Sequence, residues 1–428
     1  MNSAIVNIGQ LVTLAGSKRP RVGAELRELA IISDAAMLIE DGRIVAVAKR
    51  AELESRIDSG TSVIDAEGCC ITPGFVDAHT HLVFAGNRAD EFERRIGGAT
   101  YQEIAAAGGG ILRTVKLTRE ASEDELLAVA RKHRDWMLRG GTTTLEAKSG
   151  YGLDRETEMR MLRVIKRLHA EGPVRMVPTL LAAHTVPPGT CGAATGACAP
   201  MVNGNAGRGE FVRWVAKELI SEVAMEGLAR YCDAFCDEHA FSVEEVREVL
   251  SAAKRHGMGL RLHAEQFSPG TGAALAAELG ATTADHLETA TEATLALLRD
   301  AGVQPVLLPG SVFALGSTQY PAARKMVEMG LAIVVATDFN PGSSPVPSMP
   351  FMLSLACVQM GLLPSEALSA VTINAAWSVG LGEQVGSLEV GKQADFLIHE
   401  FKDYRELAYF IAVPARPRVF IAGREVTP

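Results

Sequence analysis

Residues 75–81 read Phe-Val-Asp-Ala-His-Thr-His, an apolar run that ends in a His-x-His pair. Alternate residues of a strand face the same way and lie roughly 6–7 Å apart, so imidazoles at His79 and His81 can converge on one metal ion. An HxH tripeptide alone is weak evidence, because it also arises by chance. Three other strand-like runs also end in histidine or aspartate: LRLHAEQ at 260–266, TADHLE at 283–288 and VVATDFNPG at 334–342.

The pattern around these runs predicts the fold. From residue 73 onward, β-rich runs alternate with amphipathic helical stretches, which is typical of a parallel sheet wrapped by helices. The helical period is plain at 156–170 and 242–256, where apolar residues form one stripe. Eight strands in this order predict an α/β fold, a (β/α)8 TIM-like barrel. They are expected near 74–80, 142–147, 174–183, 230–236, 259–264, 282–286, 304–308 and 332–337.

The two ends of the chain lie outside this count. Residues 1–72 and 385–428 contain short β-like runs punctuated by Asp-Gly and Ala-Gly turns. We expect them to form one small β-sandwich domain, with the barrel of residues 73–384 inserted between its two parts. The segment 186–209 is rich in Gly, Ala and Pro without an apolar period, which predicts a mobile loop after the third strand.

Composition narrows the class of protein. The 428 residues are 47% hydrophobic and 22% charged, as expected for a globular enzyme with little disorder. A net charge of −9 without a basic cluster argues against nucleic acid or an anionic membrane as partner. Seven cysteines without CxxC spacing favour reduced thiols and a cytoplasmic location. No apolar run approaches the ~18 residues that a membrane span needs.

The histidines cluster where a TIM barrel carries its active site, at the carboxyl ends of the strands. Asp338 closes the eighth strand and adds a carboxylate. Three neutral imidazoles and one carboxylate suit Zn²⁺ or Fe²⁺, so we expect one mononuclear site of His79, His81, His263 and Asp338. Six of the ten histidines lie at predicted strand ends: His79, His81, His184, His239, His263 and His286.

Such a site predicts hydrolytic chemistry. A divalent ion lowers the pKa of its bound water from ~15.7 towards ~7, which provides a nucleophile for a carbonyl or amidine carbon. Asp338 can bind the ion and accept the proton of the water. His286, adjacent but outside the ligand set, can donate to the developing oxyanion.

These motifs resemble the amidohydrolase superfamily over almost the whole chain. The HxH pair and the strand-eight aspartate are common to many amidohydrolases. KSGYGL with ATDFNPGS is narrower and resembles the branch that hydrolyses 4-imidazolone-5-propanoate to N-formimidoyl-L-glutamate in histidine degradation. The resemblance also implies zinc or iron and a homodimer. Its strings are PGFVDAHTHLVFAGNR at 73–88, AGGGI at 107–111, KSGYGL at 148–153, AAHTVPP at 182–188, LHAEQFS at 262–268, ADHLE at 284–288 and ATDFNPGS at 336–343.

The resemblance also suggests substrate contacts. Arg88, in the loop after His81, can pair bidentately with a propionate carboxylate, although a solvated loop arginine is the alternative. Tyr151 and His184 resemble contacts to the ring and the carboxylate, against the alternatives of a packed tyrosine and a satisfied core histidine. After Asp338 the chain forms a turn whose backbone could approach the ligand. The residues of this turn are Asn340, Gly342 and Ser343.

Two positions depart from parts of the superfamily. Some members carry a glutamate where this chain has Gln266, and a carboxamide cannot take a proton. We expect Gln266 to hydrogen-bond the substrate or the nucleophile, while strand phase places Glu265 on the metal-binding face. Lys148 closes the second strand, whereas the carboxylated lysine of two-metal amidohydrolases closes the fourth. We therefore expect one metal and a structural Lys148.

Two other functions remain open from the sequence. A metal-dependent deaminase of a nucleobase-like ring would use the same ligand set. Arg88 with Tyr151 discriminates, because a carboxylate-bearing substrate needs that pair and a nucleobase does not. A metal-free, non-catalytic scaffold of the same fold is the alternative from another class. Retention of every candidate ligand argues against it, and elemental analysis of the purified protein would separate the two.

Overall fold

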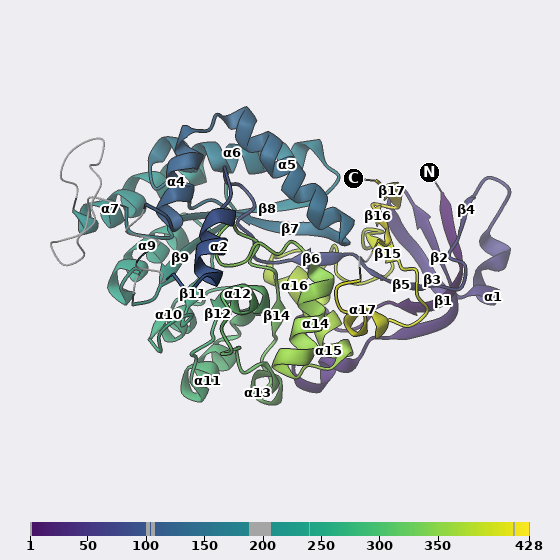
Figure 1. Ribbon diagram of the computed structural model, residues 1–428. Helices are drawn as coiled ribbons and strands as arrows, with labels where there is room; N and C mark the ends of the chain where they lie inside the picture. Colours follow the sequence, from purple (N-terminus) through teal and green to yellow (C-terminus); the bar gives the residue numbers. More distant parts are fainter. Residues whose placement is uncertain are drawn as a thin grey trace.

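The computed structural model has a helix-wrapped barrel and a smaller β-sheet beside it, near which both ends of the chain lie (Figure 1). In the part of the chain that it describes, no helix is both long and apolar enough to cross a membrane. The described residues are 2–99, 103, 108–187, 207–238, 240–413 and 416–427.

Eight strand positions form the barrel, and every neighbouring pair is parallel. The predicted TIM-like barrel is confirmed. Its fifth position is split into two short strands, β10 and β11, which both pair with β9. The strands are β6 Phe75–Asp77, β7 Thr142–Lys148, β8 Arg175–Ala183, β9 Tyr231–Cys236, β10 Gly259–Leu260, β11 His263–Ala264, β12 Thr283–His286, β13 Gln304–Leu307 and β14 Val334–Val335.

Hydrogen bonds just beyond β6 and β14 close the barrel. The backbone N–H of Asp338 donates to the carbonyl of His79 at 3.1 Å, and that of His81 donates to the carbonyl of Phe339 at 2.9 Å. Thr80 and Phe339 form a parallel bridge between these bonds. Three of the four predicted metal ligands therefore lie at the seam where the barrel closes.

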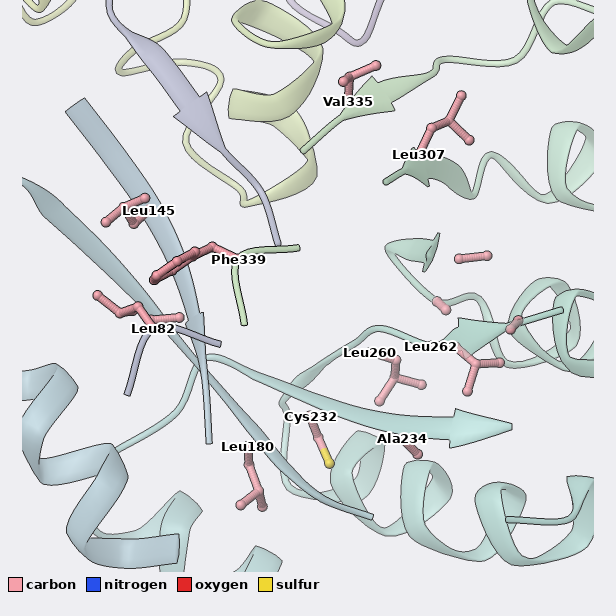
Figure 2. Packing of buried hydrophobic residues seen from close by; sticks show 14 of the residues in the cluster. Leu82, Leu145, Leu180, Cys232, Ala234, Leu260, Leu262, Leu307, Val335 and Phe339 are labelled. Carbon is pink, nitrogen blue, oxygen red and sulfur yellow. The ribbon is translucent and has the colours of Figure 1, made fainter. Parts of the chain in front are cut away.

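Side chains of β7 alternate between two environments, as the two-residue period of a strand requires. Leu145 and Ala147 belong to the apolar cluster that packs the strands against the helices, part of which Figure 2 shows. Glu146 and Lys148 are fully buried and form an ion pair at 2.9 Å. The barrel interior therefore holds charged groups, whereas the apolar contacts with the helices lie outside it.

An apolar layer fills the barrel interior on the amino-terminal side of these charges. Here α16 (Ile373–Ser378) packs against the strands, and the backbone N–H of Val76 donates to the carbonyl of Val371 at 2.9 Å. This layer therefore covers the charged groups on the amino-terminal side of the barrel. Its members include Val76, Val177, Val306, Val334, Ala375 and Ala376.

Helices follow the strands and cover the outside of the barrel (Figure 1). The two helices expected at 156–170 and 242–256 are α6 and α9, and the side chains of Asp154 and Ser242 cap their first turns. The helices are α1 Arg50–Leu53, α2 Ala89–Ile96, α4 Ile111–Glu120, α5 Glu123–Arg139, α6 Arg155–Glu171, α7 Arg208–Trp214, α8 Ile220–Met225, α9 Val243–Arg255, α10 Gly272–Leu279, α11 Glu292–Ala301, α12 Pro309–Ala314, α13 Ala323–Glu328, α14 Met349–Met360, α15 Pro364–Ala370, α16 Ile373–Ser378 and α17 Glu406–Tyr409.

Strands from both ends of the chain join in one second sheet, as the sequence predicts. Its hydrogen-bonded order is β17-β16-β15-β5-β1-β2-β3, with β4 paired to β1. Strands of both ends share a buried core, in which Phe396 and Phe420 stack at 4.4 Å. The division of the chain at residues 72 and 384 stays a prediction. The strands are β1 Ser3–Val12, β2 Ile31–Glu40, β3 Arg43–Lys49, β4 Ser62–Asp65, β5 Cys70–Pro73, β15 Phe396–Ile398, β16 Arg418–Ile421 and β17 Arg424–Val426.

Several strands end earlier than the sequence suggests. The last one, expected at 332–337, is only Val334–Val335, because Thr337 bonds the side chain of Asp77 instead of a backbone partner. The long loop expected at 186–209 falls mostly on 188–206, which lies outside the described residues. None of the five cysteines described by the structure is paired in a disulfide.

One buried side chain joins the N-terminal segment to the barrel. Asn374 Oδ1 accepts from the backbone N–H of Arg21 at 2.8 Å, and its Nδ2 donates to the carbonyls of Arg21 at 3.0 Å and Ile333 at 2.9 Å. Both hydrogens of the amide and its oxygen are therefore satisfied. No other residue type offers this combination of donors and acceptor in so short a side chain.

We expect Asn374→Ala to destabilise the protein by about 2–4 kcal/mol, because it leaves buried backbone groups without partners. Urea unfolding followed by circular dichroism measures this. Arg19→Ala is the control, since it removes an exposed ion pair with Glu25 and an exposed hydrogen bond to the carbonyl of Pro20 in the same segment, and it should leave the midpoint nearly unchanged. Equal midpoints for Asn374→Ala and the unmodified protein would contradict the assigned role.

Candidate metal centre

Three histidines and one aspartate converge at the carboxyl ends of the barrel strands. Nε2 of His79 and Nε2 of His81 are 3.3 Å apart, and Asp338 Oδ1 lies 3.5 Å from the first and 3.4 Å from the second. His263 joins the pair, with one donor atom of each histidine within 4.8 Å of the others. All four side chains are buried. The predicted ligand set therefore comes together in space.

Unusual backbone conformations shape the strand ends. Asp338 and His286 have φ of 53° and 82°, in a region that residues other than glycine rarely adopt. Such conformations cost free energy and persist only where the surroundings impose them. The backbone hydrogen bonds between the stretches that follow β6 and β14 impose the conformation of Asp338. They also turn its side chain towards the histidines.

Two carboxylates orient the imidazoles. Asp285 Oδ2 lies 2.6 Å from Nδ1 of His79, and Asp233 Oδ1 lies 3.1 Å from Nδ1 of His263. A ring whose Nδ1–H donates to a carboxylate keeps the lone pair of Nε2 free to bind a metal. Both rings therefore present Nε2 to the centre.

Two buried cations stand behind these carboxylates. Lys148 Nζ lies 2.8 Å from Asp233 Oδ2 and 2.9 Å from Glu146 Oε1, and Arg261 Nη2 lies 3.4 Å from Asp285 Oδ2. Burial alone would lower the pKa of Lys148, but Asp233 and Glu146 raise it, so its amine stays charged. A charged amine held by two carboxylates supports the expected structural role of Lys148.

The protonation states suit a bound cation. Burial lowers the pKa of His79 well below its usual value and also lowers that of His81. Burial alone would raise the pKa of Asp338, but the hydrogen bond with His81 and the neighbouring imidazoles lower it. Neutral imidazoles and an ionised carboxylate are the forms that bind metal.

The residues fit one divalent ion. Nε2 of His263 is buried and has no hydrogen-bond partner among the described residues. A buried nitrogen without a partner is costly, and a cation beside it would offset that cost. His286 forms a second group with His79 and Asp338, also within 4.8 Å. By distance His286 is therefore also a candidate ligand, and its expected place outside the ligand set stays a prediction.

The environment of His286 favours its charged form. Its Nδ1 lies 3.4 Å from Oε1 of Glu288. Burial alone would lower the pKa of His286, but the Glu288 carboxylate raises it. The imidazole can therefore carry a proton next to the metal ligands.

Two of the predicted substrate contacts stand beside His81. The ring of His184 stacks on that of His81 with centroids 5.0 Å apart, and the ring of Tyr151 is 6.0 Å away. The Nδ1 of His184 pairs with the carbonyl of Gly150 at 3.1 Å. Burial raises the pKa of Tyr151, so its hydroxyl remains a hydrogen-bond donor.

The turn after Asp338 is organised by Asn340. Its Oδ1 accepts from the backbone N–H groups of Gly342 and Ser343, each at 2.8 Å. Its Nδ2 donates to the carbonyl of Asp338 at 2.7 Å and to Ser343 Oγ at 2.9 Å. The Asn340 amide therefore holds the turn together, while the Ser343 hydroxyl keeps its hydrogen available.

Glu265 does not share the face of His263, so this expectation is wrong. β11 ends at Ala264, and Glu265 has φ of 55°, which interrupts the alternation of a strand. Its carboxylate instead accepts from Ala273 N at 3.2 Å and from Thr294 Oγ1 at 3.3 Å. Gln266 follows at a partly buried position, where its backbone N–H donates to Asp237 at 3.1 Å.

Sequence reasoning missed the groups that support the ligands. Asp233 and Arg261 each left a signal, because a charged residue inside an otherwise apolar strand needs a buried partner. Asp285 directly precedes a strand-end histidine, which is a similar signal. The carboxylate of Glu91, beside Arg88, left none. His239, counted among the strand-end histidines, lies outside the described residues.

The barrel and its histidine–aspartate cluster define the class of protein as an amidohydrolase. A model of the amidohydrolase family matches residues 70–426. The imidazolonepropionase of Solibacter usitatus is 53% identical over 426 residues, which cover 99% of this chain and 98% of the relative. That of Symbiobacterium thermophilum is 45% identical over 423 residues, 98% and 96% of the two chains. This chain belongs to the imidazolonepropionase family of the amidohydrolases.

More distant solved structures share the fold. The 5-methylcytosine deaminase of Klebsiella pneumoniae superposes with a TM-score of 0.71 over 99% of this chain and 97% of that one. Only 16% of the residues are identical, so the likeness concerns the fold alone.

We expect His263→Ala to lose bound metal, because it removes one of four ligands, while the fold is kept. Elemental analysis of the purified protein, with circular dichroism as a check of folding, measures this. The control is His256→Ala, an exposed residue at the end of α9 that should leave metal content unchanged. Full occupancy in His263→Ala would refute the ligand assignment.

Proposed function

We propose that the centre hydrolyses 4-imidazolone-5-propanoate to N-formimidoyl-L-glutamate, a step of histidine degradation. The observation that carries this is the convergence of His79, His81, His263 and Asp338 at the barrel mouth, together with Arg88 beside the same turn. Membership of the imidazolonepropionase family supports the substrate. The enzyme is thus a hydrolase that acts on a cyclic amide.

We propose zinc or iron as the metal, held by His79, His81, His263 and Asp338. Nitrogen-rich sets with one carboxylate suit both ions. When bound, the ion would lower the pKa of a coordinated water and polarise the substrate carbonyl. Asp233 and Asp285 would keep two of the imidazoles in the tautomer that binds it.

Asp338 and His286 have separate roles in the proton transfers. Asp338 accepts a proton from the attacking water, whose oxygen adds to the ring carbonyl carbon. His286, charged through Glu288, donates to the developing oxyanion. The bond between this carbon and the ring nitrogen breaks, and the proton that Asp338 accepted from the water passes to the departing nitrogen. The products of the cleavage are a carboxylate and a formimidoyl amine on the same molecule.

Other residues orient the substrate. Arg88 pairs with the propionate carboxylate, and Tyr151 and His184 contact the ring or the carboxylate from the side of His81. Gln266 hydrogen-bonds the substrate or the nucleophile. The turn after Asp338 contacts the substrate through Asn340, Gly342 and Ser343. The Ser343 hydroxyl accepts from Asn340 and has a hydrogen to donate.

The two alternative functions have less support. The likeness to the Klebsiella deaminase extends to the fold alone, at 16% identity. A metal-free scaffold would have no need for buried groups of histidine and aspartate whose donor atoms lie within 4.8 Å of one another. Family membership favours neither of the two.

We also propose that the protein acts in the cytoplasm as a homodimer, without nucleic acid or membrane as partner. The free cysteines of the described chain agree with a reducing compartment. The dimer rests on family analogy, and an apolar patch near α17 supports it, because exposed apolar groups gather at subunit interfaces. The patch comprises Val358, Tyr409, Phe410, Ile411 and Val413.

We expect hydrolysis of freshly prepared imidazolone propionate, and a roughly 10- to 150-fold lower kcat/KM in Arg88→Ala, because a charge-assisted bidentate contact is worth about 1.5–3 kcal/mol. Product formation followed by liquid chromatography measures both. Metal content should stay unchanged. Arg94→Ala, on the exposed side of α2, is the control. Unaltered kinetics in Arg88→Ala would show that the carboxylate is held elsewhere and would reopen the deaminase alternative.

A further inference from the structure

Arg88 is held on one side by a buried carboxylate. It stands at the start of α2, and its Nε donates to Oε2 of Glu91 at 2.7 Å. The Glu91 side chain is 5% exposed and that of Arg88 is 17% exposed. Among the described residues, Glu91 is the only acceptor that bonds the guanidinium, so the N–H groups of Nη1 and Nη2 remain for a ligand.

Glu91 is itself fixed from a second direction. Its Oε2 also accepts from the backbone N–H of Gly110 at 3.1 Å, and Arg113 Nη1 lies 3.6 Å from its Oε1. Gly110 immediately precedes α4. The carboxylate therefore links the starts of α2 and α4 and cannot follow Arg88 if the guanidinium moves.

The turn after Asp338 also limits the position of Arg88. A Cβ atom at Gly342 would overlap Nη1 of Arg88 and lie 3.0 Å from its Cζ. The backbone of Gly342 is fixed in turn, because its N–H donates to Asn340 at 2.8 Å. The guanidinium thus occupies space that only glycine at residue 342 leaves free.

We propose that Glu91 and Gly342 are positioning residues that hold the Arg88 guanidinium for the carboxylate of the substrate. The proposal rests on the proposed function, in which Arg88 binds that carboxylate. A long arginine side chain samples many rotamers, and fixing one before the substrate arrives lowers the entropic cost of binding. The bond at Nε leaves the two Nη groups in the planar arrangement that a carboxylate matches.

This assignment adds a second role to Gly342. The sequence suggests that its backbone approaches the ligand, and the geometry shows that its lack of a side chain makes room for Arg88. The effect of a methyl group at residue 342 should therefore depend on the presence of Arg88. A purely structural ion pair at the start of α2 would show no such dependence.

The test is a set of double-mutant cycles on the metal-loaded enzyme, with imidazolone propionate as substrate. Glu91→Gln and Gly342→Ala should each raise KM roughly 5- to 20-fold, with kcat within about threefold and metal content unchanged. In the Arg88→Ala background, neither change should alter kcat/KM by more than about twofold. Effects that multiply with that of Arg88→Ala would overturn the proposal.

Asp90→Asn is the matched control. Asp90 neighbours Glu91 on α2 and pairs with Arg113, but its side chain is 59% exposed. Its loss should leave KM unchanged. An equal rise of KM in Asp90→Asn would show that α2 as a whole, and not the Glu91 carboxylate, supports substrate binding, and would also overturn the proposal.

A structural measurement separates this proposal from the proposed function. In crystals of Gly342→Ala, the Arg88 guanidinium should be displaced from its position in the unmodified enzyme, whether or not imidazolone propionate is a substrate. An unmoved guanidinium would overturn the positioning role. Absence of hydrolysis by the unmodified enzyme would instead overturn the proposed function. If Glu91→Gln fails to fold, Gly342→Ala perturbs the same arginine from the other side and decides the question.

Discussion

Charges buried inside the barrel must each find an opposite partner, because water cannot reach them. Two chains of groups satisfy this requirement: Lys148–Asp233–His263 and Arg261–Asp285–His79. Each runs from a cation, through a carboxylate, to a ring that faces the centre. The positions of the imidazoles thus depend on these ion pairs. The apolar layer at the amino-terminal side of the barrel and the apolar contacts with the outer helices exclude water from them. Removing one of the two carboxylates, Asp233 or Asp285, would leave the imidazole that it orients without its acceptor.

Much of this arrangement could be predicted from the sequence. The two-residue period of a strand places His79 and His81 on one face. Parallel strands of a barrel present their carboxyl ends together, and this rule adds His263 and Asp338 to the predicted ligand set. These are local patterns combined with a known architecture. The eight strands and the joining of both chain ends in one sheet follow from similar patterns.

The failures have physical causes. The conformation of Glu265 reverses the expected alternation, because the strand ends one residue before it. The pairing of Asp233 with His263 joins neighbouring strands 30 residues apart in sequence, and no local pattern reveals which partner a buried charge selects. The fit between Arg88 and Gly342 depends on the closed seam, which brings together loops from opposite ends of the barrel sequence.

The second sheet constrains how the chain is made. β5 ends at Pro73, and its neighbour β15 begins only at Phe396. At roughly 5–20 residues per second, a ribosome needs about 15–60 s to synthesise the intervening barrel. During that time, one edge of β5 has unsatisfied hydrogen-bonding groups, the kind of edge at which chains aggregate. Completion of the sheet is therefore a late event. A chain released before Phe396 would keep this edge of β5 unpaired and prone to aggregation.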